Sequence, residues 1–216
     1  MTGFVASRPA IVFDFGGVLL EWDPRHLYRK LFGPDLDAME RFLAEIGFAE
    51  WNLEQDRGRP FALGVAELSQ RFPRYADLIR AYDERWEESI AGPIRPTVRI
   101  LAALKQAGRA LYGLSNWSAE TFRRIRPRYG FFDWFEAIVI SGEVGLVKPD
   151  PRIFQTFLTR VGRAPGECLF IDDGERNVAV ARSLGFDVIR FASPEQLERE
   201  LIRRALLTPG DGAGPG

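Results

Sequence analysis

Cysteine is almost absent from this chain, because Cys168 is the only one among 216 residues. A single thiol excludes an intramolecular disulfide framework and any zinc site built from several cysteines. We therefore expect a protein of a reducing compartment, and a cytoplasmic setting is favoured. Histidine is equally scarce, with His26 alone, and the His-Glu-x-x-His motif of zinc hydrolases is missing.

A strong net charge and long apolar stretches are also missing. The formal net charge is -1 at pH 7, so nothing indicates a nucleic acid or a membrane surface as the partner. No apolar stretch is long enough to span a bilayer, and Met1–Pro9 is too short and polar for a signal peptide. What remains is an ordinary globular composition, with 46% hydrophobic and 27% charged residues.

Strand-like and helix-like segments alternate after residue 93. Short apolar runs predict strands at residues 10–13, 110–114, 137–140, 168–171 and 188–191. Helical patterns lie at residues 97–106, 119–126, 151–161, 175–184 and 194–206. This alternation predicts an α/β fold with a doubly wound, Rossmann-like parallel sheet of about five strands.

The pattern between residues 21 and 92 is helical instead. Asp23-Pro24 predicts a capped helix start, and apolar residues at helical spacing predict further helices near 39–46, 61–72 and 78–86. No strand candidate interrupts this region. We therefore expect a core formed by residues 1–20 and 93–207, an all-helical cap formed by residues 21–92, and a disordered Pro/Gly-rich tail at 208–216.

Polar residues able to do chemistry follow three of the predicted strands. Asp14 follows the first strand and precedes Gly16-Gly17, Ser115-Asn116 follows the second, and Asp172-Asp173 follows the fourth. The carboxyl ends of parallel strands meet at one edge of a sheet, so these groups are expected to converge. Lys148 stands in a loop before Pro149-Asp150-Pro151, in a chain that otherwise uses arginine for nearly all its positive charge.

These residue types together suit phosphoryl transfer. A carboxylate at Asp14 can attack phosphorus, and the polar groups of Ser115 and Asn116 can hold phosphate oxygens. Asp172 and Asp173 would repel each other and Asp14 unless a cation such as Mg²⁺ lay between them. Taken alone, each motif also has a plain structural interpretation, as a strand-end turn, a helix cap or a surface lysine.

With these motifs the chain resembles the haloacid dehalogenase-like hydrolase superfamily, in its helical-cap branch, over residues 10–191. The resemblance implies that Asp14 is the nucleophile and a metal ligand, and that the cap selects the substrate. It also implies the following roles: the Gly16 carbonyl as a metal ligand, Ser115 and Asn116 as phosphoryl-binding groups, Lys148 as the neutralising cation, Asp173 as a direct Mg²⁺ ligand, Asp172 as a ligand through water, and Asn177 as a weaker supporting candidate.

Gly16 is a departure from the family pattern. Most phosphatases of the family carry a second aspartate at this position as general acid and base, a role worth roughly 10² to 10⁴ in rate. Members that resemble sugar-phosphate phosphatases share the Asp-x-Gly pattern, so catalysis is not excluded. The nearby candidates to replace the missing acid are Glu21, Asp23 and His26, and the roles of Arg57 and Arg59 are open.

We therefore expect a Mg²⁺-dependent phosphatase that hydrolyses a small phosphorylated metabolite, such as a sugar phosphate, through an aspartyl phosphate. One alternative is a metal-independent 2-haloacid dehalogenase, which the Asp172-Asp173 pair disfavours. The other is a non-catalytic phosphometabolite-binding protein that lost its acid at Gly16. The partner is a small-molecule phosphate ester, its identity is open, and the chain is a monomer or a homodimer.

Overall fold

The computed structural model describes residues 9–209. The predictions for the tail beyond residue 209 and for the first eight residues lie outside these described residues. Among the helices between residues 9 and 209, none combines the length and the apolar character needed to cross a membrane.

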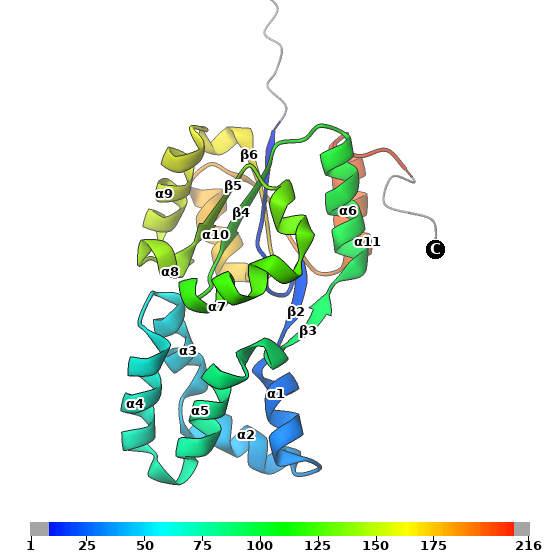
Figure 1. The fold of residues 1–216 in the computed structure, drawn as a ribbon. Helices are drawn as coiled ribbons and strands as arrows, with labels where there is room; N and C mark the ends of the chain where they lie inside the picture. Colours follow the sequence, from blue (N-terminus) through cyan, green and yellow to red (C-terminus); the bar gives the residue numbers. More distant parts are fainter. Residues whose placement is uncertain (1–8, 210–216) are drawn as a thin grey trace, which may run out of the picture.

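A five-stranded parallel sheet forms the centre of the core, which confirms the predicted fold class (Figure 1). Its order along the sheet is β5-β4-β1-β6-β7. The strands are β1 (Ala10–Phe13), β4 (Leu111–Ser115), β5 (Ala137–Ile140), β6 (Cys168–Asp172) and β7 (Asp187–Arg190). All of β1, β4 and β6 is buried, as expected for strands covered on both faces.

Helices cover both faces of this sheet. Val12 and Phe170 face a cluster that includes Phe154 of α9 (Pro151–Val161) and Val178 of α10 (Glu175–Ser183). Ile11 and Ile171 face a second cluster with α6 (Arg95–Gln106) and α11 (Pro194–Arg203). Successive residues of a strand point to opposite faces, so one short apolar run supplies both layers. The core also contains α7 (Ala119–Ile125) and the short α8 (Ser141–Val144).

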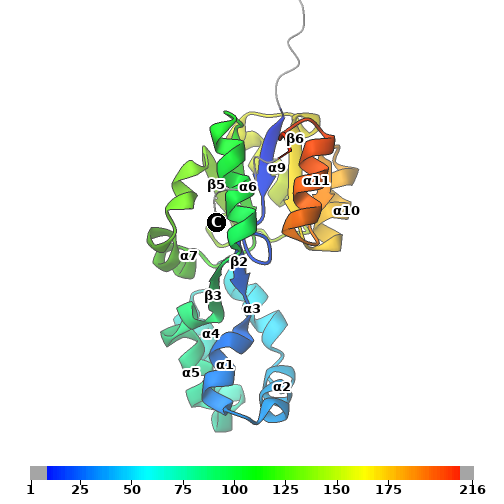
Figure 2. The same cartoon turned by 90° about the vertical axis from the view of Figure 1, so that its right-hand side faces the viewer.

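The cap contains five α-helices that lie together beyond the carboxyl end of the sheet in both views (Figures 1 and 2). They are α1 (Pro24–Phe32), α2 (Leu36–Glu45), α3 (Phe48–Asp56), α4 (Phe61–Arg71) and α5 (Ala76–Glu84). Short 3₁₀ turns of the cap lie at Pro73–Tyr75 and Trp86–Ser89, and those of the core lie at Arg126–Arg128, Gly130–Trp134 and Pro165–Glu167. Asp23 caps α1 by accepting from the backbone N–H of Arg25, as its sequence predicts.

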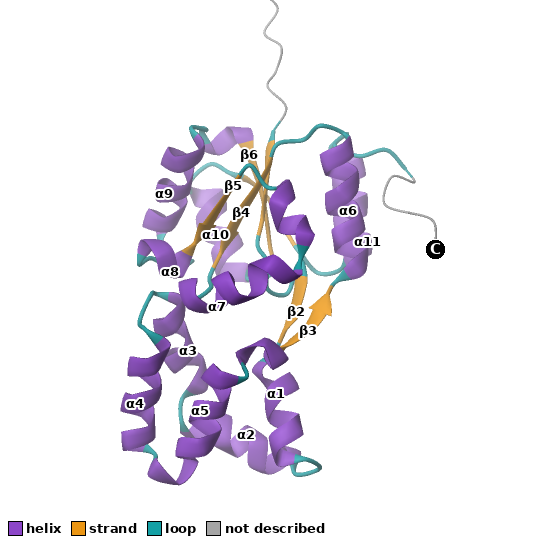
Figure 3. Cartoon of the chain, viewed as in Figure 1, coloured by secondary structure: helices purple, strands orange, loops and turns teal. Residues whose placement is uncertain are grey.

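Two elements of this region differ from the sequence expectation. An antiparallel ribbon of β2 (Leu20–Trp22) and β3 (Ile90–Pro93) joins the cap to the core, although no strand was expected between residues 21 and 92 (Figure 3). Helix α3 was not predicted either. Its buried side includes the polar residues Asn52 and Gln55, so the apolar spacing that reveals a surface helix is weak.

Polar contacts hold the cap against the core. The Ser141 hydroxyl donates to the Asp56 carbonyl at 2.5 Å, and the Phe61 N–H donates to the Glu120 carboxylate at 3.2 Å. Arg124 of α7 donates to the carbonyl of Asp83 at 3.0 Å and to its carboxylate at 3.2 Å. These contacts bring the end of α3 and the start of α8 close to the carboxyl edge of the sheet.

Candidate active site

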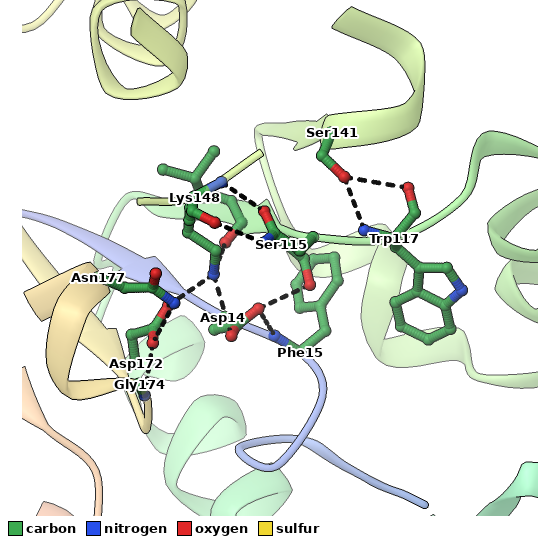
Figure 4. A network of polar contacts seen from close by, with 11 residues as sticks. Asp14, Phe15, Ser115, Trp117, Ser141, Lys148, Asp172, Gly174 and Asn177 are labelled. Carbon is green, nitrogen blue, oxygen red and sulfur yellow. Dashed lines mark hydrogen bonds and ion pairs between the residues drawn. The ribbon is translucent and has the colours of Figure 1, made fainter. Parts of the chain in front are cut away.

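The sheet brings together four of the predicted site residues. Asp14 directly follows β1, Ser115 ends β4, and Asp172 ends β6. Strands β4 and β6 flank β1, with Phe13 in register with Gly113 on one side and Ile171 on the other. Lys148 enters from the loop before α9, and the side chains meet at one point (Figure 4).

Asp14 is held by three donors. Its Oδ1 atom accepts from the Ser115 hydroxyl at 2.6 Å and from the Phe15 N–H at 2.7 Å, and its Oδ2 lies 3.0 Å from Lys148 Nζ. Burial raises the pKa of Asp14 to about 7; Lys148 opposes this shift, and the nearby carboxylates of Asp172 and Asp173 add to it. The charged form needed for attack therefore depends on positive charge at the site.

Lys148 is a fully buried ammonium with all three donors used. Besides Asp14, its Nζ contacts the Asp172 carboxylate at 2.5 Å and the Leu114 carbonyl at 3.0 Å. Burial alone would lower the pKa of Lys148, but the two carboxylates outweigh it and the pKa lies above its usual value. The lysine is therefore a fixed positive charge between the two strand ends.

Asn116 positions that lysine. Its Oδ1 accepts from the Lys148 N–H at 2.7 Å, and its Nδ2 donates to the Lys148 carbonyl at 2.9 Å. Both polar ends of the amide are thus committed to the lysine backbone. The sequence predicts that Asn116 binds the phosphoryl group, and this stays a prediction; in this structure its amide contacts the backbone of Lys148.

Asp172 is completely buried and fully hydrogen-bonded. Its Oδ1 accepts from the Gly174 N–H at 2.7 Å and from Asn177 Nδ2 at 2.9 Å, while its Oδ2 faces Lys148. Asn177 therefore orients Asp172, in line with the supporting position expected for it. With its oxygens so engaged, Asp172 is better placed to hold a metal-bound water than the metal itself.

Asp173 is exposed and supplies the third carboxylate of the site. Oxygen atoms of Asp14, Asp172 and Asp173 all lie within 4.8 Å of one another. The Asp173 carboxylate occupies the space that a side chain on Gly17 would fill. Three carboxylates balanced by one lysine leave an excess of negative charge on hard oxygen donors, and this donor set fits Mg²⁺.

A cavity of about 50 Å³ lies between this cluster and the cap. Gly16 lines it together with aromatic and polar residues of both the cap and the core, which are Trp22, Asn52, Asp56, Trp86, Asn116 and Trp117. Trp117 also packs in the core against Phe15 and Phe122, so its side chain both lines the cavity and belongs to the hydrophobic core. The cavity is small, so in this arrangement of cap and core only a compact group fits inside it.

The three candidates for the missing acid do not line this cavity. Glu21 is largely exposed, with His26 Nε2 3.8 Å from its carboxylate. Asp23 is occupied by the Arg25 backbone and guanidinium. The arginines of the cap also have local partners, because Arg57 pairs with Glu54, and Arg59 binds Gln55 and Glu67.

Sequence reasoning missed Asp56, which stands at the end of α3 and lines the cavity. Burial raises the pKa of Asp56 to about 7; the backbone N–H of Ser118 opposes the shift and the charge of Asp14 adds to it. The only sequence signal was an acidic residue before Arg57-Gly58, a turn pattern at the end of a helix that the apolar spacing did not reveal.

A model of the haloacid dehalogenase-like hydrolase family matches residues 9–185. The chain therefore belongs to the haloacid dehalogenase-like hydrolases, and the resemblance drawn from its motifs is confirmed.

Curated proteins of very different length are similar to this chain. It is 27% identical over 184 residues to the sesquiterpene phosphatase astK of Aspergillus oryzae, covering 82% of this chain and 86% of that protein. It is 45% identical over 214 residues to acyl-CoA dehydrogenase family member 10 of Mus musculus. That match covers 90% of this chain and 19% of the mouse protein, so the chain corresponds to one part of a much longer relative.

Solved structures show the same fold. A HAD family enzyme from Bacteroides thetaiotaomicron superposes with a TM-score of 0.66 at 22% identity, covering 84% of this chain and 92% of that chain. Its wild-type complex with magnesium and inorganic phosphate superposes with a TM-score of 0.62 at 25% identity, over the same shares of both chains.

Proposed function

We propose that this hydrolase is a Mg²⁺-dependent phosphatase that cleaves a small phosphate ester through a phosphoaspartate on Asp14. The observation that supports this most is the convergence of three carboxylates and Lys148 at the ends of β1 and β6. Such a cluster leaves room for a dianionic phosphoryl group only if positive charge is added, which is what a divalent cation supplies.

The residues of the site would have different roles in this reaction. Asp14 provides the carboxylate that attacks phosphorus, and Lys148 neutralises charge on the nucleophile and the phosphoryl oxygens. The Ser115 hydroxyl lies beside Asp14 and can turn from it to a phosphoryl oxygen. Asp14, the Gly16 carbonyl and Asp173 would hold Mg²⁺, with Asp172 behind them. When bound there, the cation supplies electrostatic stabilisation of the transferring group.

The similar proteins support the same reaction class. The relative from Aspergillus oryzae is a sesquiterpene phosphatase, and the enzyme from Bacteroides thetaiotaomicron binds magnesium and inorganic phosphate. The alternative is a 2-haloacid dehalogenase, which requires no metal. Such an enzyme would not explain the acidic residues Asp172 and Asp173 at the end of β6. The phosphatase accounts for all four charged groups of the site.

The test is phosphate release from a panel of small phosphate esters, with Mg²⁺ and with EDTA. We expect metal-dependent turnover in the wild type and a loss of roughly 10³-fold or more in Asp14→Asn, because the amide cannot act as the nucleophile. Asp77→Asn is the matched control, since the Asp77 side chain is 92% exposed on α5. Equal turnover in Asp14→Asn and wild type would overturn the proposal, and halide release from a 2-haloacid in EDTA would favour the dehalogenase.

A further inference from the structure

A phosphate ester with an alcohol leaving group needs a proton donor, and Gly16 has no side chain to supply one. The donor must reach the space next to the reacting phosphorus, which in this structure is the cavity bordered by Gly16. Among the described residues that line the cavity, Asp56 is the one with a titratable side chain. It comes from the cap, whereas the nucleophile comes from the core.

We propose that Asp56 is the general acid and base of this enzyme, donating a proton to the leaving oxygen from the cap side of the cavity. This inference rests on the proposed phosphatase function. It assigns to the cap a direct part in the chemistry in addition to the selection of the substrate.

Hydrogen bonds fix Asp56 in place from both sides of the cavity. Asn52, one turn earlier on α3, donates from Nδ2 to Asp56 Oδ2 at 3.2 Å, and Asn52 Oδ1 in turn accepts from the Tyr82 hydroxyl at 3.1 Å. The backbone carbonyl of Asp56 accepts from Ser141 of the core. A buried polar relay of this kind serves to hold a side chain in one orientation.

The close approach of cap and core at this point depends on Gly58. Its φ is +105°, and a side chain there would meet the Gly142 carbonyl at 3.0 Å. The turn after α3 can therefore lie directly on α8, which carries Asp56 to the edge of the sheet. This packing explains how a cap residue comes to line the same cavity as Gly16 of the core.

The surroundings of Asp56 suit both halves of acid–base catalysis. Burial raises the pKa of Asp56 to about 7. The groups that face it are the Ser118 N–H and the Asp14 carboxylate in the core, and Asn52 and Tyr82 in the cap. No cation is among them in the described part of the chain, so no positive charge offsets the effect of burial, which favours the protonated form needed for a general acid.

The reaction balances with these two carboxyl groups. In the first step Asp14 forms a bond to phosphorus, the bond from phosphorus to the ester oxygen breaks, and the Asp56 proton passes to that oxygen, which leaves as an alcohol. In the second step water attacks the phosphoaspartate while Asp56 takes a proton from it, the bond from phosphorus to Asp14 breaks, and inorganic phosphate leaves. Asp56 is then protonated again.

The experiment compares leaving groups. Wild type, Asp56→Asn and Glu21→Gln are assayed with Mg²⁺ on glycerol phosphate and on 4-nitrophenyl phosphate, and kcat/KM is measured for each. Nitrophenolate leaves without a proton, so kcat/KM reports the acid only for the alkyl ester. We expect Asp56→Asn to lose about 10²- to 10³-fold on glycerol phosphate and less than about threefold on 4-nitrophenyl phosphate. Glu21→Gln should match the wild type on both.

A second readout follows the later step. During turnover of 4-nitrophenyl phosphate, Asp56→Asn should accumulate the phosphoenzyme, because the base that activates water is missing, and mass spectrometry of quenched protein detects it. An equal loss on both esters, or none, would overturn the role of Asp56 while leaving the phosphatase intact. Turnover of either ester by Asp14→Asn at the wild-type rate would overturn the phosphatase mechanism itself.

Discussion

Gly17 illustrates how one missing side chain shapes the metal-binding corner of the site. The residue has a φ of +71°, and the Asp173 carboxylate lies where its side chain would be. Glycine is therefore required twice, once for the backbone conformation and once for the space that Asp173 occupies. The two glycines of the motif therefore differ, because a side chain at Gly16 would touch no neighbour, whereas one at Gly17 would meet Asp173.

Gly17→Ala should therefore weaken Mg²⁺ binding, because the new methyl group displaces Asp173. We expect the Mg²⁺ concentration for half-maximal activity to rise by roughly tenfold or more. Gly108→Ala is the matched control, with a φ of +68° and open space around it, so it carries the same backbone strain of roughly 1–2 kcal/mol without the displacement. If both variants required the same Mg²⁺ concentration as the wild type, Asp173 would not be a ligand.

Asp56 should also make stability depend on pH. Its pKa is raised from 3.8 to about 7 on folding, so between these values the folded state binds more protons than the unfolded state. The contribution of Asp56 to the free energy of unfolding should then fall as pH rises through this range. A buried acid with such a raised pKa is destabilising at neutral pH, a common compromise at functional sites.

Asp56→Asn removes this dependence and keeps a side chain that can accept the hydrogen bond from Asn52. Relative to the wild type, the variant should gain about 2–3 kcal/mol of stability between pH 5 and pH 8, part of the roughly 4 kcal/mol that corresponds to the full shift of about three pKa units. Denaturant unfolding of both proteins at the two pH values, without metal, measures this difference. A difference between the two proteins that stays constant with pH would show that Asp56 does not titrate in this range.

The site residues of the core could be predicted from the sequence because their reactive side chains lie at strand ends. Asp14, Ser115 and Asp172 each follow a short apolar run, and parallel strands collect such positions at one edge. Asp56 could not be found this way, because no periodic pattern marks the helix that carries it. The commitment of Asn116 to the Lys148 backbone was equally hidden, since a sequence does not show which partner an amide chooses.

At the scale of elements, the strands and helices of the core were largely predicted, whereas those that connect core and cap were not. Strands β1 and β5 and helix α9 have the predicted bounds. The ribbon of β2 and β3 is too short to produce an alternating pattern, and α8 has four residues. Elements of this size are specified by tertiary contacts rather than by local sequence.

Helix α7 should control how firmly the cap is closed, because its Arg124 reaches the end of α5 at Asp83. Arg124→Ala should lower the population of the closed state and raise KM by about three- to tenfold with little change in kcat. Arg80→Ala removes an ion pair within α5 that does not reach the core, and should leave both constants unchanged. A fall in kcat at constant KM in Arg124→Ala would contradict this role.

At the scale of the whole molecule, the proposed nucleophile Asp14 belongs to the core and the proposed acid Asp56 to the cap. The cavity between them measures about 50 Å³, well below the roughly 300–1,000 Å³ typical of small-molecule sites. We therefore take this arrangement as the closed one, and expect the cap to open for a metabolite to enter. Because the two proposed catalytic groups lie on separate parts of the chain, we expect chemistry to begin only after closure.

The central position of β1 also has a consequence for biosynthesis. Ile11 pairs with Leu111 on one side and Leu169 on the other, so on the ribosome this first strand waits through translation of the entire cap before either neighbour exists. The cap helices depend on nearby contacts and can form meanwhile, whereas the sheet must await distant segments. A nascent polypeptide stalled before Asp173 would thus lack the third carboxylate of the proposed cation site.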